Sequence, residues 1–371
     1  MTEAELPGLT AQVLWAAFAL AVAFGAIAQH TRFCSMGAVA DIVTMGDWTR
    51  MRAWIVAIAI AMLGFNTMVA FGWVQAKNTV YAGPTVLWLS NLIGGLLFGF
   101  GMVLASGCGS KTLVRVGTGN LKSLVVFFVL GLAAYATLRG VTAVARVATL
   151  DTVSFTLASG QDLPSLLAGA AGQSREWWAH VASVAIAVAL FAFVLARRDG
   201  RSAEVWVSGL GIGAVVVGVW WVSGRMGYLP EHPQTLEETF LATNSRRMES
   251  LSFVAPLAYT LDWLILFSDK TRVLTIGIVS VFGVIAGSAA VALATRSFHW
   301  EGFRGAEDTA NHLVGGLLMG VGGVLALGCT IGQGLSGVST LALGSFITLA
   351  ALIGGAVLAL RWQMWRMERA A

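Results

Sequence analysis

Residues 91–108 have the sequence NLIGGLLFGFGMVLASGC, and residues 312–329 have the sequence HLVGGLLMGVGGVLALGC. At an offset of 221 residues, 12 of these 18 positions carry the same residue, including the closing Gly-Cys pair. Self-similarity at one long offset indicates an internal duplication. In an apolar chain, a duplication of this kind favours a transporter built from two repeats, with its site at the interface between them.

The composition is that of an integral membrane protein. Of the 371 residues, 57% are hydrophobic and only 11% are charged, whereas a soluble domain usually carries about 25% charged residues. The net charge of +4 is explained by Lys and Arg residues that flank membrane spans. No basic and aromatic surface pattern favours nucleic acid, so the lipid bilayer is the predicted partner and nucleic acid is not.

The chain has three cysteines, Cys34, Cys108 and Cys329, which lie far apart in the sequence. No CxxC motif or Cys/His cluster suggests zinc or an iron–sulfur centre, so we expect neither a metal nor a cofactor. The beginning, MTEAELPGL, is acidic and lacks the basic region of a cleaved signal peptide. We therefore expect the first apolar segment to be retained.

Nine segments approach the roughly 20 apolar residues that a bilayer-spanning helix needs. They are residues 11–29, 53–74, 86–107, 121–141, 181–196, 205–222, 273–295, 313–328 and 341–361. Two apolar connections, residues 143–178 and 225–272, are too long to be simple solvent loops, and we expect short re-entrant or interfacial helices there. The sequence thus predicts an all-α integral membrane protein of about nine transmembrane helices.

The distribution of positive charge predicts the orientation. Loops after odd-numbered spans, together with the C-terminal segment, carry 14 Lys and Arg residues, and such residues concentrate on the cytoplasmic side. We therefore expect a cytoplasmic C-terminus and an N-terminus on the outside. An odd number of spans separates the two Gly-Cys segments, so the repeats face opposite ways. The predicted division is a first inverted repeat over residues 1–141, a linker with the fifth span over 142–204, and a second repeat over 205–371.

Cys108 and Cys329 each end an apolar segment, directly after Gly107 and Gly328. Polar, glycine-rich sequence follows each cysteine, which is typical of a point where one helix stops and a shorter one starts. A helix that starts at such a break exposes backbone N–H groups and the positive end of its dipole. Two breaks that meet near the midplane would form an anion site. The alternative is that both cysteines are small buried hydrophobes, and their equivalence in the repeat favours the first interpretation.

Cys34 lies after the first span and has no cysteine counterpart in the second repeat. It is either a station on the cytoplasmic side or an ordinary thiol near a helix end. The neighbouring His30 and Arg32 either attract an anion or anchor the helix at the headgroups. Lys111 either draws anions towards Cys108 or is an ordinary cytoplasmic cation.

Two further polar residues lie in apolar surroundings. Gln333 is a candidate for supporting the anion site, although most such residues form hydrogen bonds between helices. Asp262 is either a functional charge within the membrane or a helix cap in a re-entrant segment, and the sequence does not separate these interpretations.

Four motifs carry a resemblance to a known family. The motif RFCSMGA, the two GxGxxLAxGC segments, GCTIGQGLSG and the connection LSFVAPLAYTLDWL are similar to those of the YeeE/YedE sulfur-transport family. The resemblance covers nearly the whole chain. It implies a bacterial inner-membrane protein with nine spans, short plugging helices and an hourglass shape. It further implies thiosulfate uptake, with the ion passed along cysteines by S–H···S contacts.

Carried over by motif, the relay cysteines of the family correspond to Cys34, Cys108 and Cys329. Thiosulfate is a dianion with a soft terminal sulfur, and a neutral thiol is a weak donor that holds this sulfur without trapping it. A departure from the family is the segment GCGSKTLVRVG, which stands where several relatives have a GCPLR-type motif.

Three other functions remain as alternatives to a thiosulfate importer. One is a membrane sulfurtransferase that uses a cysteine persulfide, although no adjacent base or resolving cysteine pair supports it, and we therefore predict a protein that is not an enzyme. Another is a transporter of a selenium compound, since some relatives are linked to selenium metabolism. The last is a membrane subunit that recruits a soluble sulfur carrier or sulfurtransferase from the cytoplasm.

Overall fold

The computed structural model describes residues 5–370, and within this range the protein is all-α apart from two minimal two-stranded sheets. Antiparallel pairing joins β1 (Thr85–Val86) to β2 (Phe155–Thr156) and β3 (Tyr228–Leu229) to β4 (Thr239–Phe240). The helices are α1 (Leu6–His30), α2 (Ser35–Met45), α3 (Thr49–Ala70), α4 (Trp88–Leu104), α5 (Gly109–Gly117), α6 (Leu121–Arg139), α7 (Val141–Ala148), α8 (Leu163–Ala171), α9 (Arg175–Leu195), α10 (Ala203–Trp221), α11 (Ala255–Ile265), α12 (Ile276–Ala294), α13 (Ala306–Leu325) and α14 (Leu343–Ala370). Two π-helical stretches, η3 (Val222–Met226) and η4 (Gly332–Gly337), and two 3-10 turns, η1 (Ala76–Asn78) and η2 (Arg198–Arg201), complete it.

Eight helical segments of the described chain are long and apolar enough to cross a membrane, so the protein is an all-α membrane protein. Each of the nine predicted segments falls on a long helix. The ninth helix is α13, and it is less apolar than the others because its first turns carry Glu307, Asp308 and His312. Lys122 of α6 pairs with Asp308 at 2.9 Å, which explains how a carboxylate is held at the beginning of this helix.

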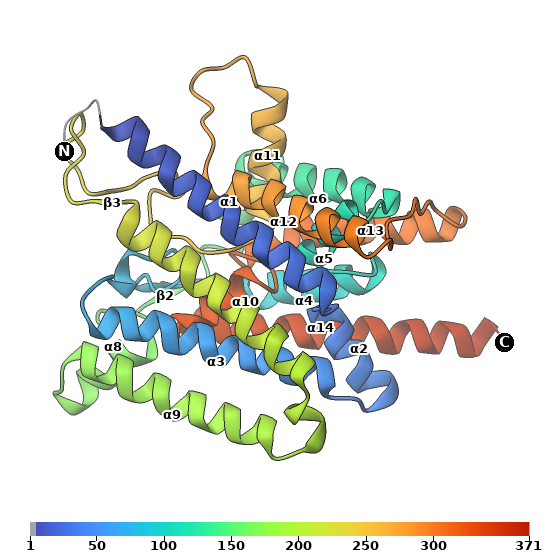
Figure 1. Ribbon diagram of the computed structural model, residues 1–371, viewed down its shortest axis with the longest axis horizontal. Helices are drawn as coiled ribbons and strands as arrows, with labels where there is room; N and C mark the ends of the chain where they lie inside the picture. The colour runs from blue at the N-terminus through green and yellow to red at the C-terminus, as the bar shows by residue number, and fades with distance from the viewer. Residues whose placement is uncertain (1–4, 371) are drawn as a thin grey trace.

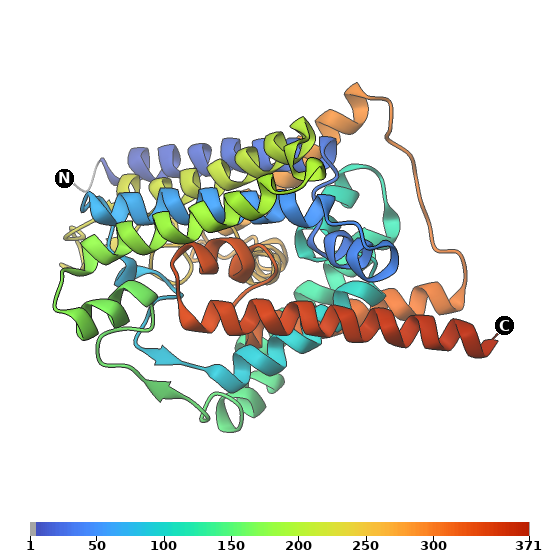
Figure 2. The same cartoon turned by 90° about the horizontal axis from the view of Figure 1, so that it is seen from below.

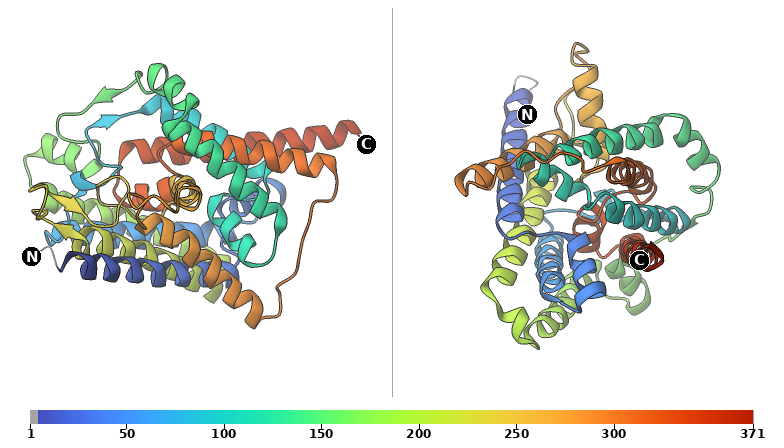
Figure 3. Two further views of the ribbon diagram at one scale, coloured as in Figure 1. Left: turned by 90° about the horizontal axis from the view of Figure 1, so that it is seen from above. Right: turned by 90° about the vertical axis from the view of Figure 1, so that its right-hand side faces the viewer.

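The helix pairs are related across the two halves of the chain. Helices α4 and α13 pack against each other, and each also packs against the last long helix of the other half, so that α4 contacts α14 and α13 contacts α6. In the same way, α1 packs against α12 and α10 packs against α3. If α1, α3, α4 and α6 are exchanged with α10, α12, α13 and α14 in that order, the same set of helix pairs results. The right-hand view of Figure 3 looks along the long helices and shows the blue-green and orange-red parts of the chain interleaved.

The contact between α4 and α13 is made by backbone, because glycines face one another. A Cβ atom at Gly101 would lie 2.7 Å from the carbonyl oxygen of Gly315, and a Cβ at Gly315 would lie 2.6 Å from that of Gly101. Gly94 and Gly322 face each other in the same way, because a Cβ atom on either one would lie 2.6 Å from the carbonyl oxygen of the other. Small residues allow this close approach of membrane helices, so the duplicated glycines are what brings the two Gly-Cys ends together.

The two long connections contain short helices, as the sequence predicts. The first holds α7 and α8, and the second holds α11, which packs against α6 and α12. The linker helix α9 packs against α3 on the outside of the bundle. The described chain begins and ends at opposite ends of the molecule along the direction of the long helices (Figure 1), and α14 extends beyond its neighbours at the C-terminal end (Figure 2).

Candidate functional site

Helices α4 and α13 end in the same backbone turn. Ser106 and Leu327 adopt the left-handed conformation, with φ of 55° and 57°. The next residue in each copy is glycine, and its N–H donates to a carbonyl five residues back, at 2.8 Å in both cases. This hydrogen bond closes a helix end that includes a left-handed residue. The predicted helix breaks are therefore present, and each delivers a cysteine to the start of a short helical segment.

Cys108 caps the beginning of α5 and is completely buried. Its Sγ atom lies 3.4 Å from the Ser35 hydroxyl, which donates to it, and 3.3 Å from the hydroxyl of Ser110. The Cys34 side chain lies close enough to the Cys108 thiol to interact with it. This thiol is thus surrounded by groups that both donate and accept.

Cys34 and Cys329 are held by backbone instead. Cys34 caps the beginning of α2, and its Sγ accepts a hydrogen bond from the Gly37 N–H at 3.3 Å. Cys329 Sγ accepts one from the Gly332 N–H, also at 3.3 Å. Cys329 interacts electrostatically with Cys108. The fold therefore brings the three predicted cysteines together in the order Cys34, Cys108, Cys329, and all three are buried and free of disulfides.

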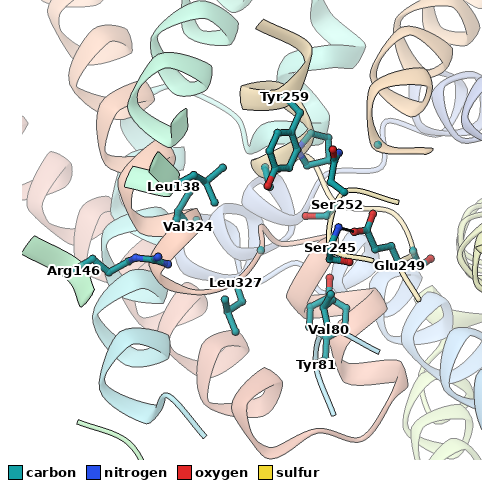
Figure 4. Close-up of a pocket in the computed structure, with 17 residues that line it drawn as sticks. Val80, Tyr81, Leu138, Arg146, Ser245, Glu249, Ser252, Tyr259, Val324 and Leu327 are labelled. Atoms are coloured by element: carbon teal, nitrogen blue, oxygen red, sulfur yellow. Dashed lines mark hydrogen bonds between the residues drawn. The ribbon is translucent and has the colours of Figure 1, made fainter. Parts of the chain in front are cut away.

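A cavity of about 180 Å³ opens next to Cys329, and Gly328 forms part of its wall. Arg146 of α7 enters from one side and Glu249 from the opposite side, while Tyr81 and Tyr259 approach from below and above (Figure 4). It lies among the connections that follow α3, α6 and η3, and we call it the outer cavity after the orientation that the sequence predicts.

A smaller cavity of about 30 Å³ lies at the other end of the thiol series, and we call it the inner cavity. Cys34 forms part of its wall together with Arg32, Arg50 and Glu204. Arg32 is exposed, and its left-handed φ of 53° turns the chain between α1 and α2. Of the predicted supporting residues, Arg32 thus lies directly beside Cys34, one of the three predicted relay cysteines.

The remaining predicted supporting residues line the two breaks. Gly107 lies against the stem of Lys111, since a Cβ there would be 3.2 Å from Lys111 Cγ. Lys111 interacts electrostatically with Cys34 and with Cys108. Gln333 occupies the corresponding place beside Gly328, where both ends of its amide are engaged: its Nε2 donates to Ala326 O at 2.5 Å and its Oε1 accepts from a serine hydroxyl. Gln333 therefore positions the second break.

Asp262 lies away from the cysteines and has partners of its own. Its carboxylate pairs with Arg272 at 3.0 Å and accepts a hydrogen bond from the Tyr135 hydroxyl at 2.7 Å. The contacts made by this side chain are those of a structural ion pair that fastens α11 to α6 and to the chain before α12. Across residues 5–370, no group of three or more His, Cys, Asp and Glu side chains is arranged to hold a metal ion.

Sequence reasoning missed several residues of the site. Arg146 and Glu249 come from the two long connections, and nothing in the local pattern distinguished them. Ser35 and Thr330 follow their cysteines directly, so a hydroxyl next to each of these thiols is a signal that was available. Ser110 lies two residues after Cys108, so its hydroxyl gave the same kind of signal.

Comparison with known proteins shows the family to which the chain belongs. A family model described as sulphur transport matches residues 30–358. The chain belongs to this YeeE/YedE sulphur-transport family. Its relatives include the thiosulfate transporter TsuA of Escherichia coli strain K12, 27% identical over 84% of this chain and 83% of the relative. TsuA of Spirochaeta thermophila is 25% identical over 90% of this chain and 94% of the relative. The probable transporter YedE of Escherichia coli strain K12 is 32% identical over 32% of this chain and 28% of the relative.

Proposed function

We propose that this protein imports thiosulfate, or a closely related small sulfur-containing anion, along a narrow path formed by three thiols. The observation that carries the proposal is that three buried thiols, Cys34, Cys108 and Cys329, are neighbours in the fold and lie between two cavities. Membership of the sulphur-transport family and the names of the two TsuA relatives support it. Transport, and no chemical conversion of the ion, is the proposed activity.

The path begins in the outer cavity, where Arg146 offers the positive charge that attracts a dianion. It continues past Gly328 to Cys329, then to Cys108 and Cys34, and ends in the inner cavity beside Arg32. The electrostatic attraction of Lys111 favours movement towards the inner end. Because Arg146 pairs with Asp151 at 3.4 Å, its attraction is moderated and the anion is released onward.

The thiols act as neutral, weak donors to the soft sulfur of the ion. A thiolate would repel a dianion, and burial in a low-dielectric interior favours the neutral group. Weak binding at several stations is what conduction requires, since an ion held tightly at one station would not move on. The backbone N–H groups of Gly37 and Gly332 donate to the sulfurs of Cys34 and Cys329. These two thiols therefore keep a fixed orientation.

We also infer the repeat organisation of the protein, its orientation in the membrane and its cellular location. The reciprocal helix pairs and the matched turns after α4 and α13 support two inverted repeats, over residues 1–141 and 205–371, with 142–204 as the linker and nine spans in all. The positive charge on one side supports a cytoplasmic C-terminus and an outer N-terminus. We place the protein in a bacterial plasma membrane, where a cytoplasmic sulfur carrier or sulfurtransferase would accept the imported ion.

Uptake of sulfur-35 thiosulfate into proteoliposomes tests this proposal. We expect saturable uptake that excess unlabelled thiosulfate abolishes and sulfate does not. Sulfite, selenite and tetrathionate serve as further competitors and report whether the path prefers sulfur or selenium. Competition by sulfate as strong as that by thiosulfate would show that the soft sulfur is not recognised and would overturn the relay mechanism.

A further inference from the structure

Three hydroxyl groups in the wall of the outer cavity form no hydrogen bond with any of the described residues. They belong to Tyr81, Ser252 and Tyr259. Tyr81 is only 5% exposed, and a buried polar group without a partner costs stability. Ser250 lines the same cavity, yet its hydroxyl donates to a backbone carbonyl at 2.9 Å. The three unpaired hydroxyls are therefore available to a ligand, whereas that of Ser250 is used within the protein.

The unpaired hydroxyls face a space that a small ion can fill. Tyr81 lies in the connection after α3 and Tyr259 lies on α11, and their hydroxyls point into the cavity from opposite walls (Figure 4). The cavity volume of about 180 Å³ is many times the roughly 10–15 Å³ that one water molecule needs. The donors and the space for an anion thus coincide.

Two of these side chains lie next to the first thiol of the path. A Cβ atom at Gly332 would lie 2.5 Å from the Oγ of Ser252, and the N–H of Gly332 donates to the Sγ of Cys329 at 3.3 Å. Tyr81 lies close enough to Cys329 to interact with it electrostatically. An ion held by these hydroxyls would therefore be one step away from Cys329.

The fold holds Tyr81 in place from both halves of the chain. Its ring packs edge-on against Trp220 of α10, with the ring centroids 6.2 Å apart. The turn before it is fastened to the second long connection, because the N–H of Met248 donates to Asn78 O at 2.9 Å. The hydroxyl donors are thus brought together only where the two halves meet.

The charges in the cavity wall balance each other. Among the described residues that line it, the charged ones are Arg146 and Glu249, which lie on opposite sides (Figure 4). Arg146 also pairs with Asp151 at 3.4 Å. Net charge therefore gives the cavity little selectivity, and recognition depends on its neutral donors. Binding sites are commonly of this kind, mostly apolar with a few placed polar groups that fix the orientation of the ligand.

We propose that Tyr81, Ser252 and Tyr259 form an entry site that binds the oxygen atoms of a sulfur oxyanion and directs its terminal sulfur towards Cys329. This inference deepens the proposed function and rests on it. Thiosulfate has three hard oxygens at one end and a soft sulfur at the other. Hydroxyls are better donors to the oxygens than thiols are. Because they carry no charge, they hold the ion weakly enough for it to move on.

Variants that remove one hydroxyl test the proposal by uptake of sulfur-35 thiosulfate into proteoliposomes. Tyr81→Phe and Ser252→Ala should each raise the KM about tenfold, which corresponds to one hydrogen bond to an anion. The maximal rate should be unchanged, because the thiols are intact. Tyr228→Phe is the matched control and should keep the wild-type KM, since Tyr228 packs against Phe240 and does not line the cavity. An unchanged KM in both test variants would overturn the proposal.

A binding measurement separates recognition from transport. In Cys108→Ser the outer cavity is intact, so thiosulfate should still raise the melting temperature. Adding Tyr81→Phe should remove most of this increase. Without thiosulfate, Tyr81→Phe should melt like the wild type, because the ring and its packing are kept. An equal increase with and without the Tyr81 hydroxyl would contradict the entry site.

An ion without oxygen atoms tests which end of the substrate the hydroxyls bind. Hydrosulfide has a soft sulfur and no oxygen, so its inhibition of uptake should be equal in the wild type and in Tyr81→Phe. If hydrosulfide and thiosulfate are weakened by the same factor, the hydroxyls do not recognise the oxygens and the proposal is wrong. Absence of uptake by the wild type would instead overturn the proposed function, and the melting temperature would still report whether the cavity binds the ion.

Discussion

The two helix breaks have the same backbone and different side chains. Both α4 and α13 end in a left-handed residue, a glycine and a cysteine, with matching hydrogen bonds. Beside the glycine, however, the first break carries Lys111 and the second carries Gln333. The thiol of the first break contacts hydroxyls, whereas that of the second accepts a backbone N–H.

Under the proposed function, this difference would give the path a direction. Backbone geometry, set by glycines, was kept in both copies because it builds the meeting point. Charge was not kept in both copies: Lys111, Arg32 and Arg50 all lie on the side of Cys34, while the second break is neutral and opens to the outer cavity. Along the proposed path, matching backbone with unequal charge would give an anion a lower energy at one end.

The largest expected effect comes from the thiols themselves. Cys108→Ser and Cys329→Ser should each reduce thiosulfate uptake to the background of empty vesicles, because a hydroxyl lacks the soft sulfur while it keeps the local hydrogen bonds. Uptake of sulfur-35 thiosulfate by equal amounts of purified protein measures this. Because serine is nearly isosteric, both variants should keep the wild-type melting temperature. Full uptake by both would refute the relay.

The second effect concerns the packing that the two copies share. Gly101→Ala and Gly315→Ala should lower stability by similar amounts, about 1–3 kcal/mol, because each new methyl group meets the backbone of the opposite helix. Thermal unfolding in detergent measures it. Gly354→Ala is the matched control, since a Cβ there lies 3.7 Å from its nearest neighbour. Unequal losses would show that the two halves of the crossing are not equivalent.

A smaller effect is expected from the charge that distinguishes the two breaks. Lys111→Gln makes the first break resemble the second and should lower uptake about five- to tenfold, equivalent to about 1 kcal/mol of electrostatic attraction. Lys111→Arg keeps the charge and should retain most of the activity. The salt dependence of uptake should weaken in Lys111→Gln. If uptake and its salt dependence are both unchanged in this variant, Lys111 does not attract the ion and is an ordinary cation of the predicted cytoplasmic side.

The fold could be predicted from the sequence because its cause is local. The duplicated glycines and the apolar lengths fixed the helix breaks and the long helices, including α13, whose charged first turns make it the least obvious. The site also depends on distant segments, so the position of Arg146 across the cavity from Glu249 had no sequence signal. Asp262 is a further example: its apolar neighbours left a functional charge and a helix cap equally open, and the sequence did not show that Arg272, ten residues along the chain, pairs with it.

The smallest expected effect is a pH dependence that originates in the outer cavity. Burial raises the pKa of Glu249 above its ordinary value of 4.5, and its carboxyl accepts a hydrogen bond from the Ser245 N–H at 2.8 Å. The charged and titratable groups that face it across the cavity are Arg146, Tyr81 and Tyr259. As the pH rises through the raised pKa, the carboxylate forms, opposes Arg146 and repels the incoming dianion.

Uptake should therefore decline about two- to threefold as the pH rises through this window, and Glu249→Gln should stay at the low-pH rate throughout. Stability follows the same sign: the contribution of the protonated carboxyl is complete below the ordinary pKa and is lost as the pH rises through the raised one. Glu231→Gln, an exposed residue of the same connection that does not line the cavity, is the control and should keep the wild-type profile. A decline of the same size in Glu249→Gln would assign the pH dependence to another group and leave the charge asymmetry of the two breaks as the sole source of direction.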